Sequence, residues 1–257
     1  MLDTMNAIVG GINGVLWSYV LIIVLVGIGL YFTLKTGFVQ IRYFFEMFAV
    51  LRHGITTHKP KGKEISSFQA FCISTASRVG VGNIAGIAIA VVLGGPGAIF
   101  WMWVIAIIGS ASGFVESTLA QIYKVPYREG GYHGGPAYYI KNALKQPAVA
   151  ALFAILITMT FALFYNSVQS NTIAMALKDS FGFNPIITGL VLCVLTSMII
   201  FGGAHRIAKA ATFLVPIMAL LYLGVAVIIF FKNIELVPSM FYLVVHDAFC
   251  PQAAVSG

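Results

Sequence analysis

Residues 77–86 read Ser-Arg-Val-Gly-Val-Gly-Asn-Ile-Ala-Gly, and they interrupt a segment that is otherwise as long and as apolar as a membrane span. Three glycines and an asparagine disfavour a continuous helix here. In hydrocarbon every backbone N–H and C=O group needs a partner, so a broken helix is tolerated only where the freed groups face protein, water or a ligand. The stretch therefore predicts a discontinuous helix with a binding site at the break.

The composition of the chain indicates a membrane protein. Of its 257 residues, 60% are hydrophobic and 9% are charged, and the mean hydropathy is +0.95, far from the averages of soluble domains. Uncharged runs of roughly 20 or more residues are candidate membrane spans. The expected fold is an all-α integral membrane protein with six transmembrane helices. We expect them at about residues 14–34, 67–92, 98–122, 149–176, 185–203 and 208–231.

The basic residues predict the orientation. The loops within 35–63, 124–145 and 206–209 hold 12 of the 15 Lys and Arg residues, whereas Lys178 and Lys232 lie on the opposite side. Because basic loops stay in the cytoplasm, both termini are expected outside. These loops also account for the net charge of +7, and the chain has no basic, aromatic-interleaved module of the kind that binds nucleic acid.

Three other stretches have ordinary explanations. Residues 36–66 begin with an amphipathic segment that predicts a helix lying in the membrane interface. Residues 130–136 are glycine-rich but lack the flanking strand and Lys-Ser/Thr of a phosphate loop, so we expect a cytoplasmic turn. Phe100, Trp101 and Trp103 fit an aromatic belt. With no nucleophile–base pair, metal-ligand cluster or cofactor loop in view, an enzyme is not expected.

The break itself suggests what it binds. If the helix unwinds around Gly80, Val81 and Gly82, the upstream half ends in carbonyls that can hold a cation and the downstream half begins with N–H groups that can hold an anion. Glycine lets the backbone approach a ligand, and Asn83 can add an oxygen to a sodium site. The alternative is that these glycines only allow close helix packing.

Several motifs resemble one family. Residues 80–86 and 94–106 closely resemble the signature region of the alanine or glycine:cation symporters, the sodium:alanine symporter family. Further matches cover residues 116–121, 134–140, 169–171, 202–203 and 206–208. The resemblance extends over essentially all 257 residues, apparently as the N-terminal half of the family's chain.

This resemblance implies a secondary transporter with a leucine-transporter-like inverted-repeat fold, importing alanine or glycine with sodium across the plasma membrane. Residues 14–34 would be an extra N-terminal span, and residues 67–231 would form the first five-helix repeat with its broken helix near 79–83. By likeness, the amides of Val81 and Gly82 face the substrate carboxylate. Many family members have threonine where this chain has Val81, so a hydroxyl contact is lost there.

The likeness also implies ion and side-chain ligands. Backbone carbonyls from Ala76 to Val79 and the Asn83 side chain would lie near sodium, the only ion or cofactor expected. The fourth span lines the substrate site in such folds, and its Asn166 and Gln169 share a face at i and i+3. They are expected to face the substrate, the alternative being hydrogen bonds between helices. A role for Glu116 as a coupling-ion ligand is a weaker alternative.

Residues 232–257 are expected to be an external segment leading to a second repeat that this sequence lacks. Because rocking of two repeats around a central site requires both, a single truncated transmembrane domain would need a chain that supplies the second repeat. Two hypotheses follow. The chain is part of a sodium-coupled symporter embedded in the lipid bilayer, or it is a non-transporting membrane fragment with an assembly or interaction role.

Overall fold

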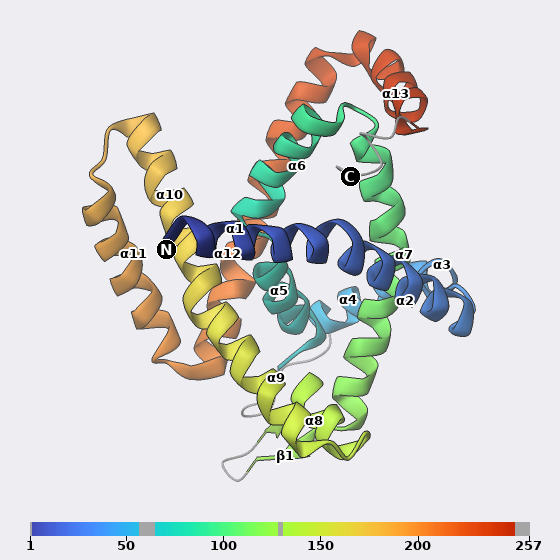
Figure 1. The fold of residues 1–257 in the computed structure, drawn as a ribbon, viewed down its shortest axis with the longest axis vertical. Helices are drawn as coiled ribbons and strands as arrows, with labels where there is room; N and C mark the ends of the chain where they lie inside the picture. The colour runs from blue at the N-terminus through green and yellow to red at the C-terminus, as the bar shows by residue number, and fades with distance from the viewer. Residues whose placement is uncertain (1, 57–64, 128–130, 250–257) are drawn as a thin grey trace. The chain divides into compact units, whose positions relative to one another are not determined.

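The computed structural model describes residues 2–56, 65–127 and 131–249, and helices dominate these ranges (Figure 1). Four helical segments are long and apolar enough to cross a membrane, namely Thr4–Lys35, Ala98–Ile122, Pro147–Phe181 and Gly203–Lys232. A fifth candidate consists of α5 (Ser67–Arg78) and α6 (Val81–Gly94), which form one span bent by 49°. These features confirm an all-α membrane protein with four or five span-capable helices among the described residues.

The first span begins earlier than the sequence predicts. The helix starts in α1 (Leu2–Val15), continues through the π-helical η1 (Leu16–Leu21) and ends in α2 (Ile22–Lys35), whereas the prediction starts at residue 14. Three glycines lie in α1, and glycine is well tolerated in helices of apolar surroundings. The predicted span at 185–203 corresponds to α11 (Pro185–Ile200), which has 16 residues and is shorter than the other candidates.

The remaining helices follow the predicted order. After α7 (Ala98–Ile122), one helical run comprises α9 (Pro147–Met159), the π-helical η2 (Thr160–Tyr165) and α10 (Asn166–Phe181). The last long helix is α12 (Gly203–Lys232), so that Arg206 and Lys209, expected in a loop, lie within its first turns. The shorter helices are α3 (Val39–Arg42), α4 (Phe44–Thr56), α8 (Pro136–Asn142), η3 (Ile234–Leu236), α13 (Val237–His246) and η4 (Asp247–Phe249).

Local signals in the sequence set where the helices start. A capping box opens α5, because Ser66 Oγ accepts from the Gln69 N–H at 3.2 Å and Gln69 Oε1 accepts from the Ser66 N–H at 3.0 Å. At α11, Asn184 Oδ1 accepts from the Ile186 N–H at 2.9 Å, and Pro185 occupies the first turn, where its missing N–H costs nothing. The first cap fixes the residue at which α5 starts, and the second does the same for α11.

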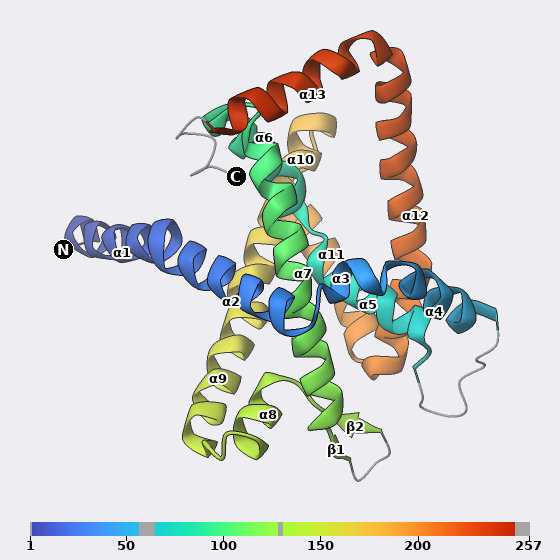
Figure 2. The ribbon, with the colours of Figure 1, turned by 90° about the vertical axis from the view of Figure 1, so that its right-hand side faces the viewer.

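The chain divides into two compact units. The first contains Met1–Phe45, Ala88–Thr118 and Leu236–Gly257. In it, Ile108 of α7 lies against Gly29 of α2, where any Cβ would come within 2.5 Å of Ile108 Cγ2. At the start of α7, the Trp101 Nε1–H donates to the Ala248 carbonyl at 2.5 Å, and Figure 2 shows the end of α13 beside this end of α7.

This contact changes the explanation of the aromatic cluster at residues 100–103. Phe100 lies 6.1 Å from the Phe249 ring, and Trp103 lies 6.1 Å from the Phe241 ring. An aromatic belt is therefore an incomplete account, since these side chains contact the segment α13–η4 instead of lipid alone. The sequence missed these contacts because they join positions more than 130 residues apart.

The second unit contains Glu46–Ile87 and Leu119–Glu235. Its core lies between α5 and α12, where Cys72, Ala211 and Val215 are buried with Phe68 and Ile73 against them. The helices α10 and α11 lie side by side (Figure 1), joined by a short turn at Gly182, whose φ is +73°. This unit carries every residue that the sequence assigns to substrate or sodium.

The connecting segments agree only partly with expectation. Within 36–66, the amphipathic stretch forms α3 and α4, and residues 57–64 lie outside the described part of the chain. The expected turn at 130–136 belongs to a small hairpin in which β1 (Val125–Pro126) pairs antiparallel with β2 (Tyr132–His133), while residues 128–130 are not described. This hairpin is the only departure from all-helical structure among the described residues.

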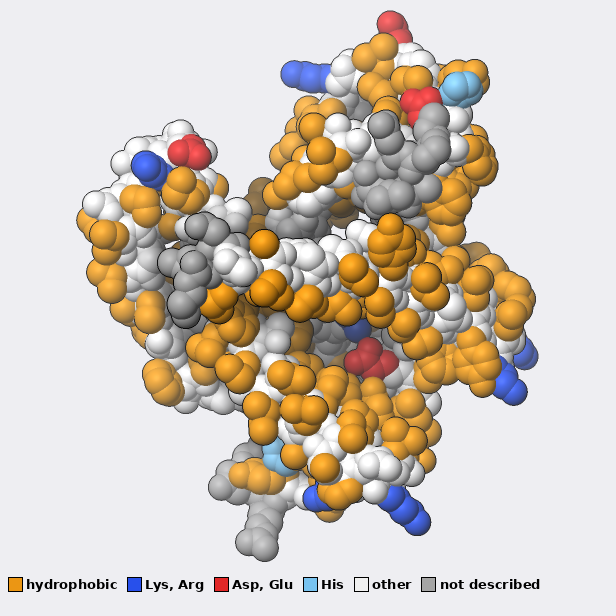
Figure 3. Space-filling view, viewed as in Figure 1, with side chains coloured by type: hydrophobic (Ala, Val, Ile, Leu, Met, Phe, Trp, Pro, Cys, Tyr) orange, Lys and Arg blue, Asp and Glu red, His pale blue; other side chains and the backbone are white. Residues whose placement is uncertain are grey.

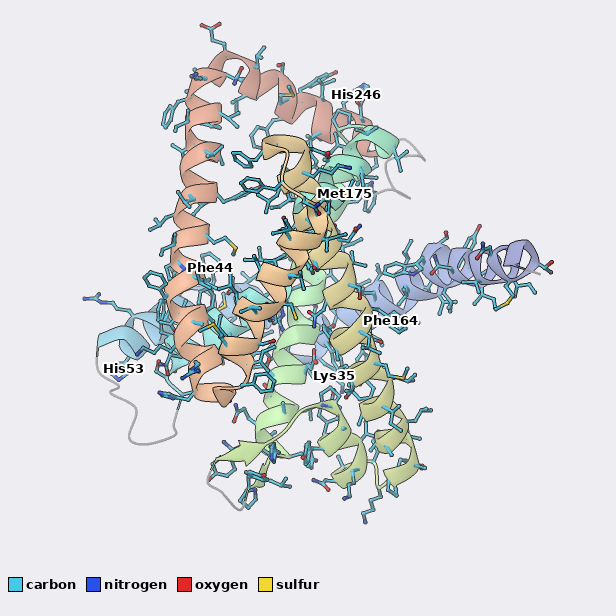
Figure 4. The ribbon with its side chains drawn as sticks, turned by 90° about the vertical axis from the view of Figure 1, so that its left-hand side faces the viewer. Lys35, Phe44, His53, Phe164, Met175 and His246 are labelled. Carbon is cyan, nitrogen blue, oxygen red and sulfur yellow. The ribbon has the colours of Figure 1, made fainter. Side chains whose placement is uncertain are left out.

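The long helices expose their apolar side chains. In the most apolar part of each of the four long spans, only 6 to 11% of the residues are buried. Hydrophobic side chains, orange in Figure 3, cover much of the face shown there. Phe164 and Met175, labelled in Figure 4, are 62% and 41% exposed on the α9–α10 run. Such surfaces are stable in lipid or against further protein, but not in water.

Candidate functional site

The predicted break lies between Arg78 and Val81. The α5 helix ends with the Val79 N–H donating to the Thr75 carbonyl at 2.9 Å, and Val79 itself is extended (φ −93°, ψ 110°). The α6 helix begins at Val81, and the two helices differ in direction by 49°. The sequence predicted the break near residues 79–83, whereas in the structure only residues 79 and 80 are non-helical and residues 81–83 form the first turn of α6.

The start of α6, which the sequence predicts to face an anion, has one amide with and one without a hydrogen-bond acceptor among the described residues. The Val81 N–H donates to Oε1 of Gln169 in α10, at 3.1 Å. Across the described residues, no acceptor faces the Gly82 N–H, whereas the Asn83 N–H donates to the Gly80 carbonyl at 3.1 Å. The two amides predicted to face a carboxylate are thus adjacent, and one of them holds a side chain from a distant helix.

The end of α5 supplies the carbonyl groups that the sequence predicts to lie near sodium. Within residues 65–127 and 131–249, no donor engages the carbonyl oxygens of Ala76 and Val79, both expected near sodium. Asn83 lies beside them, and its Nδ2 donates to the Arg78 carbonyl at 2.8 Å. The sequence expected the oxygen of Asn83 at this site, but the structure places its amide nitrogen against the carbonyl.

The two glycines at the break have different surroundings. A Cβ on Gly80 would collide with Nε2 of Gln169, with Cδ at 3.2 Å and Oε1 at 3.3 Å. A Cβ on Gly82 would meet nothing within 4 Å. A side chain at position 80 would therefore displace the flexible Gln169 carboxamide, whereas Gly82 borders open space.

Asn166 has different neighbours from Gln169, although the sequence expected them to share a face. The Asn166 Nδ2 donates to the Ala162 carbonyl of its own helix at 3.3 Å, and its side chain lines an open groove of about 530 Å³ between the α9–α10 run and the start of α11. Other residues lining this groove are Leu163, Ser167, Ser170, Asn171, Ala174, Pro185, Ile186 and Gly189. The structure joins Gln169, but not Asn166, to the break.

Two charged residues that the sequence places in or near the spans are Arg78, beside the break, and Glu116, the weaker candidate for a coupling-ion ligand. Arg78 is the last residue of α5, exposed, and its carbonyl accepts the Asn83 amide. Glu116 is exposed on α7 in the first unit. The residue that sequence reasoning underused is Gln169, whose bond to Val81 spans 88 positions and has no local signal.

A helical membrane protein with a discontinuous span, lined by free backbone groups, has the architecture that secondary transporters use for substrate and ion sites. A family model described as the sodium:alanine symporter family matches residues 2–257. The chain belongs to this family. Its members are transporters and not enzymes, and the family couples transport to sodium.

Curated relatives agree with this assignment. The chain is 52% identical over 257 residues to the probable sodium/glutamine symporter GlnT of Bacillus subtilis, covering 100% of this chain and 53% of that protein. It is 47% identical over 254 residues to the amino-acid carrier protein AlsT of the same organism, covering 98% and 53%. It is 36% identical over 249 residues to the sodium/alanine symporter AgcS of Methanococcus maripaludis, covering 95% and 54%. The chain thus spans about half the length of these relatives.

Proposed function

We propose that this chain forms the substrate- and sodium-binding half of a sodium-coupled amino-acid symporter. The observation that carries the proposal is the bent span α5–α6, which presents a free N–H at Gly82 and free carbonyls at Ala76 and Val79. A helix N-terminus favours an anion and a helix C-terminus favours a cation. One break can therefore hold an amino-acid carboxylate and a sodium ion together.

Each proposed ligand follows from its place at the break. The carboxylate lies over the Val81 and Gly82 amides, on the open side of Gly82 and next to Gly80. Sodium is held by the carbonyl oxygens of Ala76 and Val79 and, after the amide turns, by Oδ1 of Asn83. Gln169 borders the substrate directly.

Asn166 is a weaker candidate substrate ligand than Gln169. It keeps that role only if the substrate, or a part of the complete transporter, extends into the groove that Asn166 lines.

The substrate is proposed to be a small neutral amino acid. Alanine and glycine follow from the resemblance of the motifs, and the relative named as a sodium/glutamine symporter adds glutamine to the substrates worth testing. Val81 offers no hydroxyl to the ligand. Because the backbone amides meet the carboxylate that all three share, selection among them depends on the groups that face the substrate side chain.

The proposed architecture is an extra N-terminal span followed by the first five-helix repeat of a leucine-transporter-like fold, which counts α11 as a span. In this proposal both termini of this chain lie on the external side of the plasma membrane. A second repeat completes the site. Its source is the half of the relatives' length that this sequence does not cover.

Two leucine substitutions one turn apart test the location of the site. We expect Gly82→Leu to reduce sodium-dependent uptake of labelled alanine, glycine or glutamine at least about tenfold, because the side chain fills the space proposed for the carboxylate. Gly86→Leu is the matched control, since Gly86 also lies in α6 with open space around its Cβ position. Uptake is measured in vesicles carrying this chain and the remaining half of the 52% identical relative.

Equal loss in both variants would place the effect in helix packing and contradict the proposed site. The other candidate is a membrane fragment with an assembly or interaction role that transports nothing. No uptake in any arrangement, despite correct insertion, would favour that candidate, whereas uptake that does not depend on sodium would contradict the proposed sodium coupling.

A further inference from the structure

The break in this structure is capped by the chain itself. On its N–H side, the Gln169 carboxamide oxygen accepts from Val81 at 3.1 Å. On its carbonyl side, the Asn83 carboxamide nitrogen donates to Arg78 at 2.8 Å. An uncharged acceptor thus stands where the proposed function needs an anion, and an uncharged donor stands beside the place where it needs a cation.

The Gln169 carboxamide has specific contacts with the break. Its carboxamide lies so close to Gly80 that a side chain there would have to displace it, and Gly80 is not among the positive-φ glycines of the described chain. Gln169 itself is only partly exposed, and its helix begins directly after the π-helical η2. The close fit holds one side-chain amide against one backbone amide across 88 positions of sequence.

We propose that Gln169 is an exchangeable internal ligand of the broken helix, whose Oε1 holds the Val81 N–H in the empty transporter and yields it to the substrate carboxylate on loading. This inference rests on the proposed function and adds to it a competition between a side chain and the substrate for one hydrogen bond. Asn83 has the corresponding role at the other end, where its nitrogen yields the carbonyl region to sodium.

The Val81 N–H has a hydrogen-bond acceptor both with and without substrate, and the acceptor that the substrate supplies forms the stronger bond. An uncapped N–H at membrane depth costs free energy because no water is there to bond it. The Gln169 oxygen removes that cost, but a hydrogen bond to a neutral amide is roughly half as strong as one to a carboxylate. The displaced carboxamide keeps two N–H donors, which can turn toward the carboxylate that replaced its oxygen.

Amide hydrogen exchange tests the cap without any transport. In the substrate-free chain, Gln169→Ala is expected to speed exchange at Val81 by about 2- to 10-fold, the equivalent of one lost hydrogen bond. Gln169→Met, similar in length but without the carboxamide, should do the same and guards against a folding defect. Asn166→Ala is the matched control, because Asn166 bonds to its own helix and should leave Val81 unchanged. Unaltered exchange in both Gln169 variants would overturn the inference.

Substrate binding tests the exchange. Gln169→Glu places a carboxylate at the same atoms, so it should keep Val81 protected while weakening sodium-dependent binding of labelled alanine and glutamine at least about tenfold through like-charge repulsion. Wild-type affinity in Gln169→Glu would contradict the competition. If the wild type completed by the second half bound no amino acid while Val81 protection still depended on Gln169, the proposed function would fail and the internal cap would stand.

Discussion

At the scale of single residues, the two glycines of the break separate packing from binding. The space beside Gly80 is filled by the Gln169 side chain, whereas Gly82 borders open space. The sequence suggested one shared reason for both, the close approach of a ligand. In the structure Gly80 contacts Gln169, and the close approach of a ligand stays a prediction for Gly82. Local sequence could not reveal this difference, because the partner of Gly80 lies 89 positions further along the chain.

A double substitution checks the packing role of Gly80. Gly80→Ala should destabilise the purified chain by about 0.5–1.5 kcal/mol, because the new methyl group displaces the Gln169 carboxamide and costs its hydrogen bond to the Val81 N–H. In the Gln169→Ala background, Gly80→Ala should cost little more, because the carboxamide and its hydrogen bond are already absent. Thermal unfolding in detergent is the measurement, with Gly82→Ala as the control that lacks a neighbour within 4 Å. Equal unfolding temperatures for the Gly80 and Gly82 variants would contradict the assignment.

At the scale of helices, the hydrophobic runs predicted the elements well and their partners poorly. Runs of apolar residues bounded by charge and proline predicted α7 to its end residues and α9–α10 to within five residues. The i and i+3 spacing of Asn166 and Gln169 was less informative. Such positions differ by about 60° around a helix, which is enough for one to meet α6 and the other the groove beside α11.

The segment α13–η4 supplies a second element-scale case, in which one hydrogen bond holds a short helix to α7. Trp101→Phe should lose the bond to the Ala248 carbonyl and increase exchange or proteolysis after residue 236 by about 2- to 10-fold. Trp103→Phe is the matched control, because Trp103 contacts Phe241 through its ring face and a phenyl ring can replace it. If the two variants behave alike, the Trp101 bond does not anchor the segment.

At the scale of the whole molecule, the proposed orientation predicts that two positions near helix ends lie on opposite sides of the membrane. The last turn of α10, which contains Ser180, should face outside, and the turn after α8, around Ala143, should face the cytoplasm. In a variant without native cysteines, an impermeant maleimide added to intact cells should label Ser180→Cys at once and Ala143→Cys only after permeabilisation. The reverse pattern would invert the topology and reject the positive-inside argument.

The central claim, that this chain provides the sodium and substrate site of a symporter, is tested most directly by the coupling itself. Proteoliposomes containing the chain and the remaining half of its 52% identical relative are given an inward sodium gradient and labelled alanine, glycine or glutamine. The account predicts accumulation above equilibrium that collapses when the gradient is dissipated and is absent in Gly82→Leu. Uptake that is equal in sodium and potassium, or that Gly82→Leu leaves unchanged, would contradict it.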